Sequence, residues 1–143
     1  MKNIYATALV INGKGILIRG KQGYGKSLLT LELLDYFKEK SSLIADDRVD
    51  IVIENNVIFM SPPKNIAGLI ELHGRGIISL PYQEKAQLNL IVDLVEKTTR
   101  MPEKGEFFAT IEGMQYARCP IPKRKLTDSS HQILLIKQAL AEL

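Results

Sequence analysis

The sequence has little of three features that would each point to a particular class of protein: cysteine, aromatic residues and long apolar runs. Its one cysteine, Cys119, cannot form an internal disulfide, so a reducing, cytoplasmic location is expected. Aromatic residues make up 6% of the chain, and Lys and Arg are scattered, which argues against nucleic-acid binding through a basic stripe with stacking platforms. No apolar run approaches the roughly 18 residues of a membrane span, and no export signal opens the chain. We therefore expect no membrane and no nucleic-acid partner.

The remaining composition is that of an ordinary globular protein. Hydrophobic residues are 45% and charged residues 24% of the 143 residues, a length that suits one domain. The formal net charge of +3 is a mild excess that suits an enzyme binding an anion. We expect residues 1–143 to form a single α/β domain.

One motif points directly to a ligand. The pattern G-x-x-x-x-G-K-[ST] is spelled by Gly20, Lys21, Gln22, Gly23, Tyr24, Gly25, Lys26 and Ser27. Such a loop turns backbone N–H groups toward phosphate oxygens, while Lys26 reaches the β and γ phosphates and the Ser27 hydroxyl binds Mg²⁺. The apolar run 15–19 before it and the helical pattern 28–38 after it supply the strand and helix that the motif requires. An incidental glycine-rich turn is the weaker alternative.

The rest of the chain predicts many strands and few helices. Asn12-Gly13 and Asn55-Asn56 mark tight turns, and Glu112-Gly113 lies between two further apolar runs. The expected strands are 5–11, 15–19, 43–45, 49–53, 57–60, 88–95, 107–111 and 114–117. The apolar segments 66–72 and 77–80 lie on either side of a tight backbone passage at Gly74 and Gly76. A final helix over 129–143 would begin at an N-cap on Ser129 or Thr127. The expected fold class is a strand-rich α/β kinase domain with a helix after the phosphate loop and another at the C-terminus.

Two adjacent carboxylates, Asp46 and Asp47, follow the strand 43–45. Beside a phosphate loop, one can hold Mg²⁺ while the other accepts a proton from an attacking hydroxyl group, as phosphoryl transfer requires. A nearby Mg²⁺ and Lys26 would keep such a carboxylate ionised. The alternative is that the two residues only end a strand in a turn.

A basic cluster near the end of the chain has two open interpretations. It consists of Arg118, Lys123, Arg124 and Lys125, interrupted by two prolines. It would form either a solvated loop or a surface that contacts phosphate or a partner.

Three ordered blocks resemble the catalytic domain of the bacterial HPr kinase/phosphorylase family. They are 15–27, with the phosphate loop, 43–49, with Asp46-Asp47, and 68–78, which is similar to the family signature E-I-R-G-x-G-I-I. A weaker similarity continues from 92 to 122. The resemblance implies a fold like that of phosphoenolpyruvate carboxykinase, a short form made of the catalytic domain alone, and a hexameric homo-oligomer.

The resemblance also implies chemistry. Members use ATP and Mg²⁺ to phosphorylate a serine of the phosphocarrier protein HPr, and many remove that phosphate with inorganic phosphate as acceptor. Carried over, Lys26 binds phosphate, Ser27 and Glu71 hold Mg²⁺, the pair Asp46-Asp47 contains the base, and Arg100 matches a later catalytic arginine. The expected partner is therefore an HPr-like phosphocarrier of the phosphotransferase system.

Two positions depart from the family pattern. The family usually has histidine where Tyr5 stands and arginine where His73 stands. Tyrosine does not titrate near neutral pH, and histidine lacks the two-pronged guanidinium. These departures keep a second hypothesis open, a nucleotide-binding regulatory module with weakened catalysis. A small-molecule kinase ranks third, because no second substrate pocket is recognisable.

Overall fold

The computed structural model describes all 143 residues and contains eleven strands and two α-helices. The strands are β1 (Lys2–Tyr5), β2 (Thr7–Ile11), β3 (Lys14–Arg19), β4 (Ser41–Ala45), β5 (Arg48–Glu54), β6 (Val57–Ser61), β7 (Leu69–Leu72), β8 (Gly76–Ser79), β9 (Ala86–Val95), β10 (Phe108–Ile111) and β11 (Met114–Pro122). The helices are α1 (Lys26–Phe37) and α2 (Ser129–Ala141). Short 3-10 turns, η1 (Lys38–Lys40), η2 (Lys64–Ile66), η3 (Lys104–Phe107) and η4 (Arg124–Leu126), join several of them.

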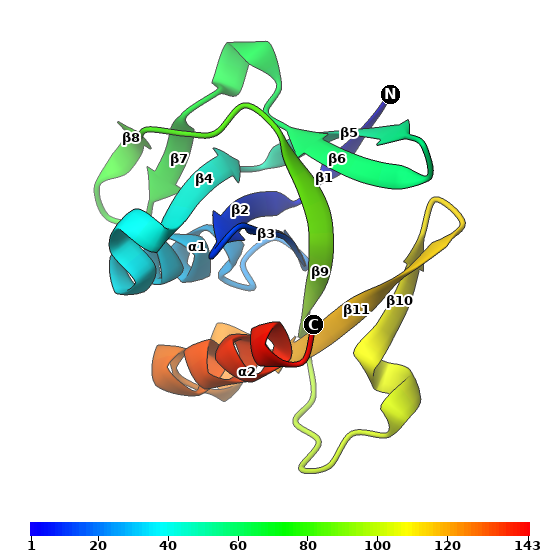
Figure 1. The fold of residues 1–143 in the computed structure, drawn as a ribbon. Coiled ribbons are helices and arrows are strands. Elements are labelled where there is room, and N and C mark those ends of the chain that lie inside the picture. The colour runs from blue at the N-terminus through cyan, green and yellow to red at the C-terminus, as the bar shows by residue number, and fades with distance from the viewer.

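Nine strands form one mixed sheet, in which β9 is the longest strand (Figure 1). The order runs β1-β5-β6-β9-β3-β2-β4, with β11 also pairing with β9 and β10 pairing with β11. The strands β3 and β11 both run parallel to β9, while β2 pairs antiparallel with β3. Strands β7 and β8 form a separate hairpin.

The central strands are buried on both faces, which explains why they read as continuous apolar runs. On one face, Leu9, Ile16 and Val92 pack against α1, α2 and the phosphate loop. On the other face, Val10, Leu17 and Ile91 pack against residues of β4, β5 and β6. Alternate residues of each strand therefore serve two different cores, and the phosphate loop lies on the helical face.

The expected strand-rich architecture is confirmed, including the helix after the phosphate loop and the helix at the C-terminus. The predicted hairpins around Asn12-Gly13, Asn55-Asn56 and Glu112-Gly113 form as β2–β3, β5–β6 and β10–β11. The last of these strands continues to Pro122, because β11 leaves its hairpin partner and goes on pairing with β9. Pro120 and Pro122 are tolerated there because this part of β11 has β9 as its only neighbour, and a proline at a sheet edge can lack an N–H without breaking the pairing.

Two expectations were wrong. The N-cap of α2 is Asp128, whose carboxylate accepts a hydrogen bond from the His131 amide at 2.9 Å. The expected strand 5–11 is divided between two strands, because β1 ends at Tyr5 and pairs with β5, whereas β2 begins at Thr7 and pairs with β3 and β4. At the end of β4, the side chain of Asp46 accepts a hydrogen bond from Ser27 at the start of α1.

Candidate functional site

The phosphate loop joins the buried strand β3 to α1, and its glycines adopt conformations that other residues rarely take. Gly23 has a φ of 86° and Gly25 a φ of 95°, both in the left-handed region. Gly25 is also the N-cap of α1, with no side-chain hydrogen bond to the free N–H groups of the first turn. Those N–H groups and the positive end of the helix are therefore available to an anion.

Lys26, the first residue of α1, is 7% exposed and has its ammonium group folded back onto the loop. Its Nζ donates hydrogen bonds to the carbonyls of Gly20 at 2.6 Å and Lys21 at 3.2 Å. Burial lowers the pKa of Lys26, while the nearby carboxylates of Asp46 and Asp47 oppose this shift. The ammonium thus lies against the loop that would hold phosphates.

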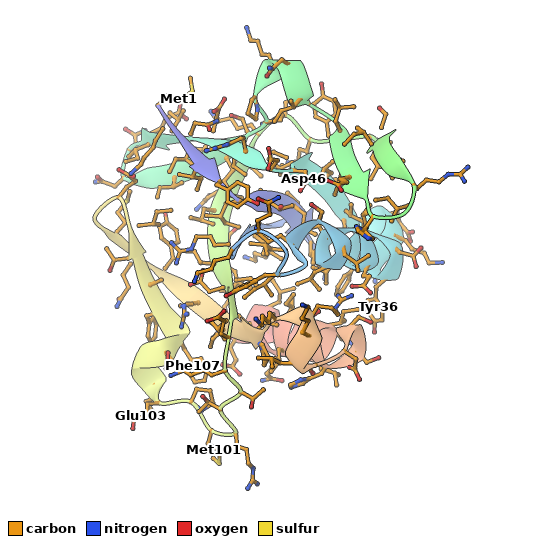
Figure 2. All side chains as sticks on the ribbon, turned by 180° about the vertical axis from the view of Figure 1, so that it is seen from behind. Met1, Tyr36, Asp46, Met101, Glu103 and Phe107 are labelled. Carbon is orange, nitrogen blue, oxygen red and sulfur yellow. The ribbon has the colours of Figure 1, made fainter.

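Asp46, at the end of β4, is the most tightly held carboxylate of the site. It is 7% exposed, and its Oδ1 accepts hydrogen bonds from the Ser27 hydroxyl at 2.7 Å and the Thr7 hydroxyl at 2.9 Å. The amide N–H of Glu71 donates to its Oδ2 at 3.3 Å. Figure 2 shows Asp46 beside the start of α1, as the predicted link to the phosphate loop requires. Three donors around one buried carboxylate fix its orientation.

Asp47 differs from its neighbour in exposure and in hydrogen bonding. Its side chain is exposed and takes part in none of the hydrogen bonds or ion pairs of the structure. Its backbone has a φ of 69°, which turns the chain between β4 and β5, and its carbonyl accepts from the Ala6 amide at 3.3 Å. The carboxylate of Asp47 is therefore free to contact a substrate.

The ring of Tyr5 faces the two cations of this region. Lys26 Nζ lies 4.3 Å from the ring centroid and the Arg48 guanidinium carbon 5.6 Å from it, within the range of cation–π attraction. Burial, followed by the charges of Asp47 and Asp46, raises the pKa of Tyr5, so its hydroxyl stays neutral at physiological pH. Tyr5 thus stands beside both aspartates and the phosphate loop.

The donors present suit a magnesium ion that arrives with a nucleotide. No group of three His, Cys, Asp or Glu side chains forms a metal site by itself. Mg²⁺ commonly takes one or two protein oxygens and completes its shell with phosphates and waters, and Ser27 and Asp46 offer such oxygens side by side. Glu71 has an exposed side chain and approaches Asp46 only through its backbone, so its role as a metal ligand stays a prediction.

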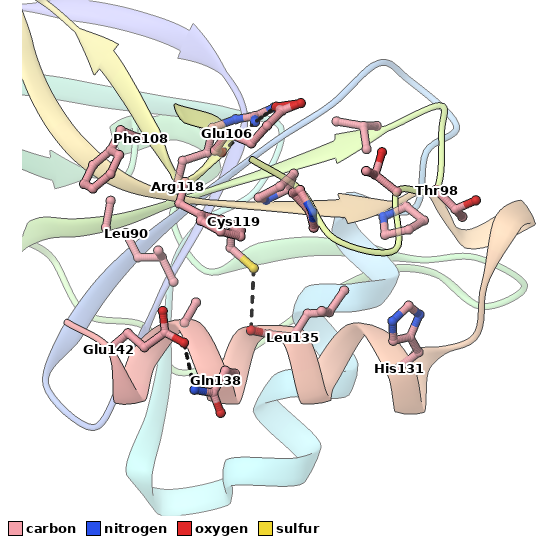
Figure 3. A pocket seen from close by; sticks show the side chains of 18 of the residues that line it. Leu90, Thr98, Glu106, Phe108, Arg118, Cys119, His131, Leu135, Gln138 and Glu142 are labelled. Atoms are coloured by element: carbon pink, nitrogen blue, oxygen red, sulfur yellow. Dashed lines mark hydrogen bonds and ion pairs between the residues drawn. The ribbon is translucent and has the colours of Figure 1, made fainter. Parts of the chain in front are cut away.

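Arg100 and His73 lie outside this cluster. Arg100 is an exposed residue that lines a cavity of about 780 Å³ between the 97–108 segment, β11 and α2 (Figure 3). None of Gly20–Ser27, Asp46 or Asp47 lines that cavity, and Met101, next to Arg100, is well separated from Asp46 in Figure 2. The catalytic role of Arg100 therefore stays a prediction, and His73 lies exposed in the β7–β8 turn.

Sequence analysis did not identify two residues of the site, Thr7 and Arg48. Thr7 is fully buried and holds Asp46, and Arg48 contacts the ring of Tyr5. A polar residue at a buried position of an apolar strand was the available signal for Thr7, because such groups need partners. Nothing local distinguishes Arg48 from other surface arginines.

The helices are both too short to cross a membrane.

Comparison with known proteins gives consistent results. The family model "HPr Serine kinase C-terminal domain" matches residues 1–127. The HPr kinase/phosphorylase of Streptococcus mutans is 30% identical over 132 residues, which cover 84% of this chain and 42% of that protein. The protein of the same name from Clostridium acetobutylicum is 41% identical over 78 residues, covering 54% of this chain and 25% of that one. The chain thus spans less than half the length of these relatives.

A solved structure matches nearly the whole fold. The HPr(Ser) kinase/phosphatase from Coxiella burnetii superposes with a TM-score of 0.80 and 27% identity, covering 99% of this chain and 92% of that one. The likeness therefore includes the sheet, both helices and the segments that position Asp46 beside Ser27. Since the family model also covers all the residues of this cluster, the chain belongs to the family of HPr serine kinase C-terminal domains.

Proposed function

We propose that this protein is a Mg·ATP-dependent serine kinase that acts on an HPr-like phosphocarrier protein. The observation that carries the proposal is the division of labour between two adjacent carboxylates. Asp46 is buried and bonded to the Ser27 hydroxyl, as a magnesium-side carboxylate should be, whereas Asp47 is exposed and unpaired. The names of the relatives support HPr as the substrate.

Each residue then has one task. The N–H groups of the loop and the first turn of α1 bind phosphate oxygens, and Lys26 leaves the Gly20 and Lys21 carbonyls to neutralise phosphate charge. The magnesium ion, held by Ser27 and Asp46, supplies further charge neutralisation when bound. Asp47 takes the proton from the hydroxyl group of the substrate serine as that oxygen bonds to the γ phosphorus, while the bond from this phosphorus to the β–γ bridging oxygen breaks and ADP leaves.

Incubation with Mg·ATP and an HPr-like protein tests the proposal. We expect a stable phosphoserine, and we expect Asp47→Asn to slow its formation by about 10²- to 10⁴-fold while ATP affinity changes little. Asparagine also accepts a positive φ, so this variant should fold. No phosphoserine at saturating nucleotide from the unmodified protein would contradict the proposal.

The same assay run in reverse tests for removal of the phosphate with inorganic phosphate as acceptor. A light-scattering mass tests the proposed hexamer, and fractionation of cells tests the expected cytoplasmic location.

A second candidate is a nucleotide-binding regulatory module with weakened catalysis. The observation that favours it is Tyr5, whose hydroxyl stays uncharged and does not titrate at physiological pH because its pKa is raised. Its ring centroid lies 4.3 Å from the Lys26 ammonium. Tight ATP binding without turnover would support this candidate. The double replacement Tyr5→His with His73→Arg should then raise the rate, and an unchanged rate would show that neither residue limits catalysis.

A further inference from the structure

The turn η4 lies directly against the phosphate loop. The backbone N–H of Arg124 donates to the Tyr24 carbonyl at 3.5 Å. A Cβ atom at Gly25 would stand 3.3 Å from the Cβ of Arg124, so the two backbones approach closely. Lys123 adds a contact, with its ammonium 4.8 Å from the centroid of the Tyr24 ring. The turn therefore forms one wall of the loop.

The side chain of Arg124 ties this turn to both helices. Its guanidinium forms a two-pronged ion pair with Glu32 of α1 and donates to the Gln132 Oε1 of α2 from Nε at 3.2 Å and from Nη2 at 2.9 Å. Gln132 is 1% exposed, and its Nε2 donates to the Pro122 carbonyl at 2.9 Å. Every polar group of this small network has a partner, which is the condition for such a network to hold one geometry.

Three of the four residues of the basic cluster are paired within the protein, and the fourth, Lys125, is exposed. Arg118 is bound to Asp93, Lys123 lies 3.6 Å from Glu96, and Arg124 is paired with Glu32. The charge of Arg124 is therefore neutralised inside the protein. Arg124 thus lies beside the phosphate loop, but its guanidinium is paired with Glu32 and is not free to bind a phosphate.

We propose that Arg124 is a positioning residue that braces the phosphate loop in its binding conformation. Within the loop, the Lys26 ammonium bonds to the Gly20 and Lys21 carbonyls, but no side chain caps α1 at Gly25, so support at that end of the loop comes from a neighbouring segment. Arg124 supplies it by fixing η4 to Glu32 and Gln132 while its backbone contacts Tyr24 and Gly25. The inference concerns how the proposed nucleotide site is held, and in that respect it rests on the proposed function.

Three variants and one control test the brace. Arg124→Met removes the network, Arg124→Lys keeps the charge without the two-pronged geometry, and Glu32→Gln weakens the ion pair. The control is Lys137→Met, because Lys137 also joins α2 to α1, through the Tyr36 hydroxyl at 3.0 Å, but outside the loop. The first measurement is the Kd for Mg·ATP by calorimetry, with thermal unfolding to confirm folding.

A brace predicts that all three variants weaken nucleotide binding. We expect about a tenfold higher Kd for Arg124→Met and Glu32→Gln, a smaller increase for Arg124→Lys, and less than a twofold change for Lys137→Met. If Arg124 instead bound phosphate directly, Glu32→Gln would release its guanidinium and lower the Kd. A lower or unchanged Kd for Glu32→Gln therefore overturns the inference.

Hydrogen exchange of the nucleotide-free protein gives a second test that does not depend on the proposed activity. Arg124→Met should speed exchange of the amides at 24–29 by about tenfold or more relative to Lys137→Met, with the central strands unchanged. Equal exchange in both variants overturns the inference. If the unmodified protein bound no Mg·ATP, the proposed function would fail while this measurement still decided the brace.

Discussion

The environment of a carboxylate decides what it can do, and one of the three donors around Asp46 is a fully buried hydroxyl. Thr7 is fully buried on β2 and donates to Asp46 Oδ1 at 2.9 Å, the same oxygen that accepts from Ser27. Without Thr7, the oxygen would keep one hydroxyl partner, and a buried carboxylate with fewer donors is costly. Thr7 thus links the first strands of the chain to the carboxylate proposed to hold magnesium.

Replacing Thr7 tests this link. We expect Thr7→Val, which keeps the shape and removes the hydroxyl, to lower the free energy of unfolding by about 1–3 kcal/mol. Thr7→Ser should restore most of the loss, because it returns the donor. Urea unfolding measures both, and equal stability of the Val and Ser variants would show that the hydrogen bond contributes little.

For single residues, the sequence predicted which side chains carry the chemistry better than it predicted which side chains contact one another. Gly20–Ser27 and Asp46-Asp47 could be recognised because their residue types follow from phosphate and magnesium chemistry. Asp46 could not be distinguished from Asp47, because their difference comes from Thr7 and Glu71, which lie far away in the chain. The role of Arg124 as an internal ion pair was hidden for the same reason.

Among the elements, the parallel pair β3–β9 positions the phosphate loop. Gly15 opens this pair at a register shift, where its amide donates to the side chain of Asn89 at 2.9 Å. A Cβ at Gly15 would lie 1.9 Å from the Gln87 carbonyl oxygen, which is impossible without moving one strand. The glycine is therefore required for the two strands to approach each other.

We expect Gly15→Ala to destabilise the fold by about 3 kcal/mol or more, because backbone atoms would have to separate. Gly105→Ala is the matched control, since a Cβ there meets nothing within 4 Å and its φ is not positive. Thermal unfolding of both variants checks the prediction. A Gly15→Ala protein as stable as the control would mean that β9 shifts at little cost.

Local patterns predicted the elements but not their order. Asn12-Gly13 and Asn55-Asn56 specify tight hairpins, so β2–β3 and β5–β6 could be expected from neighbouring residues alone. The pairing of β9 with β3 joins residues about 74 apart in the chain, and its pairing with β11 joins residues 27 apart. No local pattern encodes such pairings, which is why the strand order could not be predicted from the sequence.

On the scale of the whole molecule, one carboxylate joins three strands and a distant turn. Asp93 of β9 accepts hydrogen bonds from Arg19 of β3 at 2.7 and 2.8 Å and from Arg118 of β11 at 2.6 Å. Arg118 also donates to the Glu106 carbonyl at 3.0 Å. Burial opposes ionisation of Asp93, but the two arginines outweigh it and hold the pKa of Asp93 below its ordinary value of 3.8.

This network predicts an acid-sensitive part of the stability. Because the pKa is lower in the folded protein, the contribution is complete above about pH 4 and is lost as the pH falls through the folded pKa. Asp93→Asn should lower the free energy of unfolding at neutral pH by about 2–3 kcal/mol, less than for a fully buried pair because Arg19 is 35% exposed.

The free energy of unfolding, measured from pH 7 to pH 2, checks both expectations. For Asp93→Asn it should be lower at neutral pH and should fall less as the pH is lowered. Glu54→Gln, which breaks an exposed pair with Lys85 at 2.9 Å, is the control and should behave like the unmodified protein. An Asp93→Asn protein with unchanged acid dependence would assign the loss to other groups.

The cysteine that the sequence has only once gives the molecule a natural reporter of its own motions. Cys119 lies beneath α2, its thiol donates to the Leu135 carbonyl at 3.6 Å, and burial raises its pKa to about 12. At neutral pH the thiol is protonated and buried in the wall of the cavity in Figure 3, so a disulfide reagent should react with it slowly until the C-terminal helix or the 97–108 segment moves away. The rate of labelling, compared with that of the denatured chain, would measure the free energy of that opening without any introduced probe, and rapid labelling of the native protein would show that one of these two segments is only loosely docked.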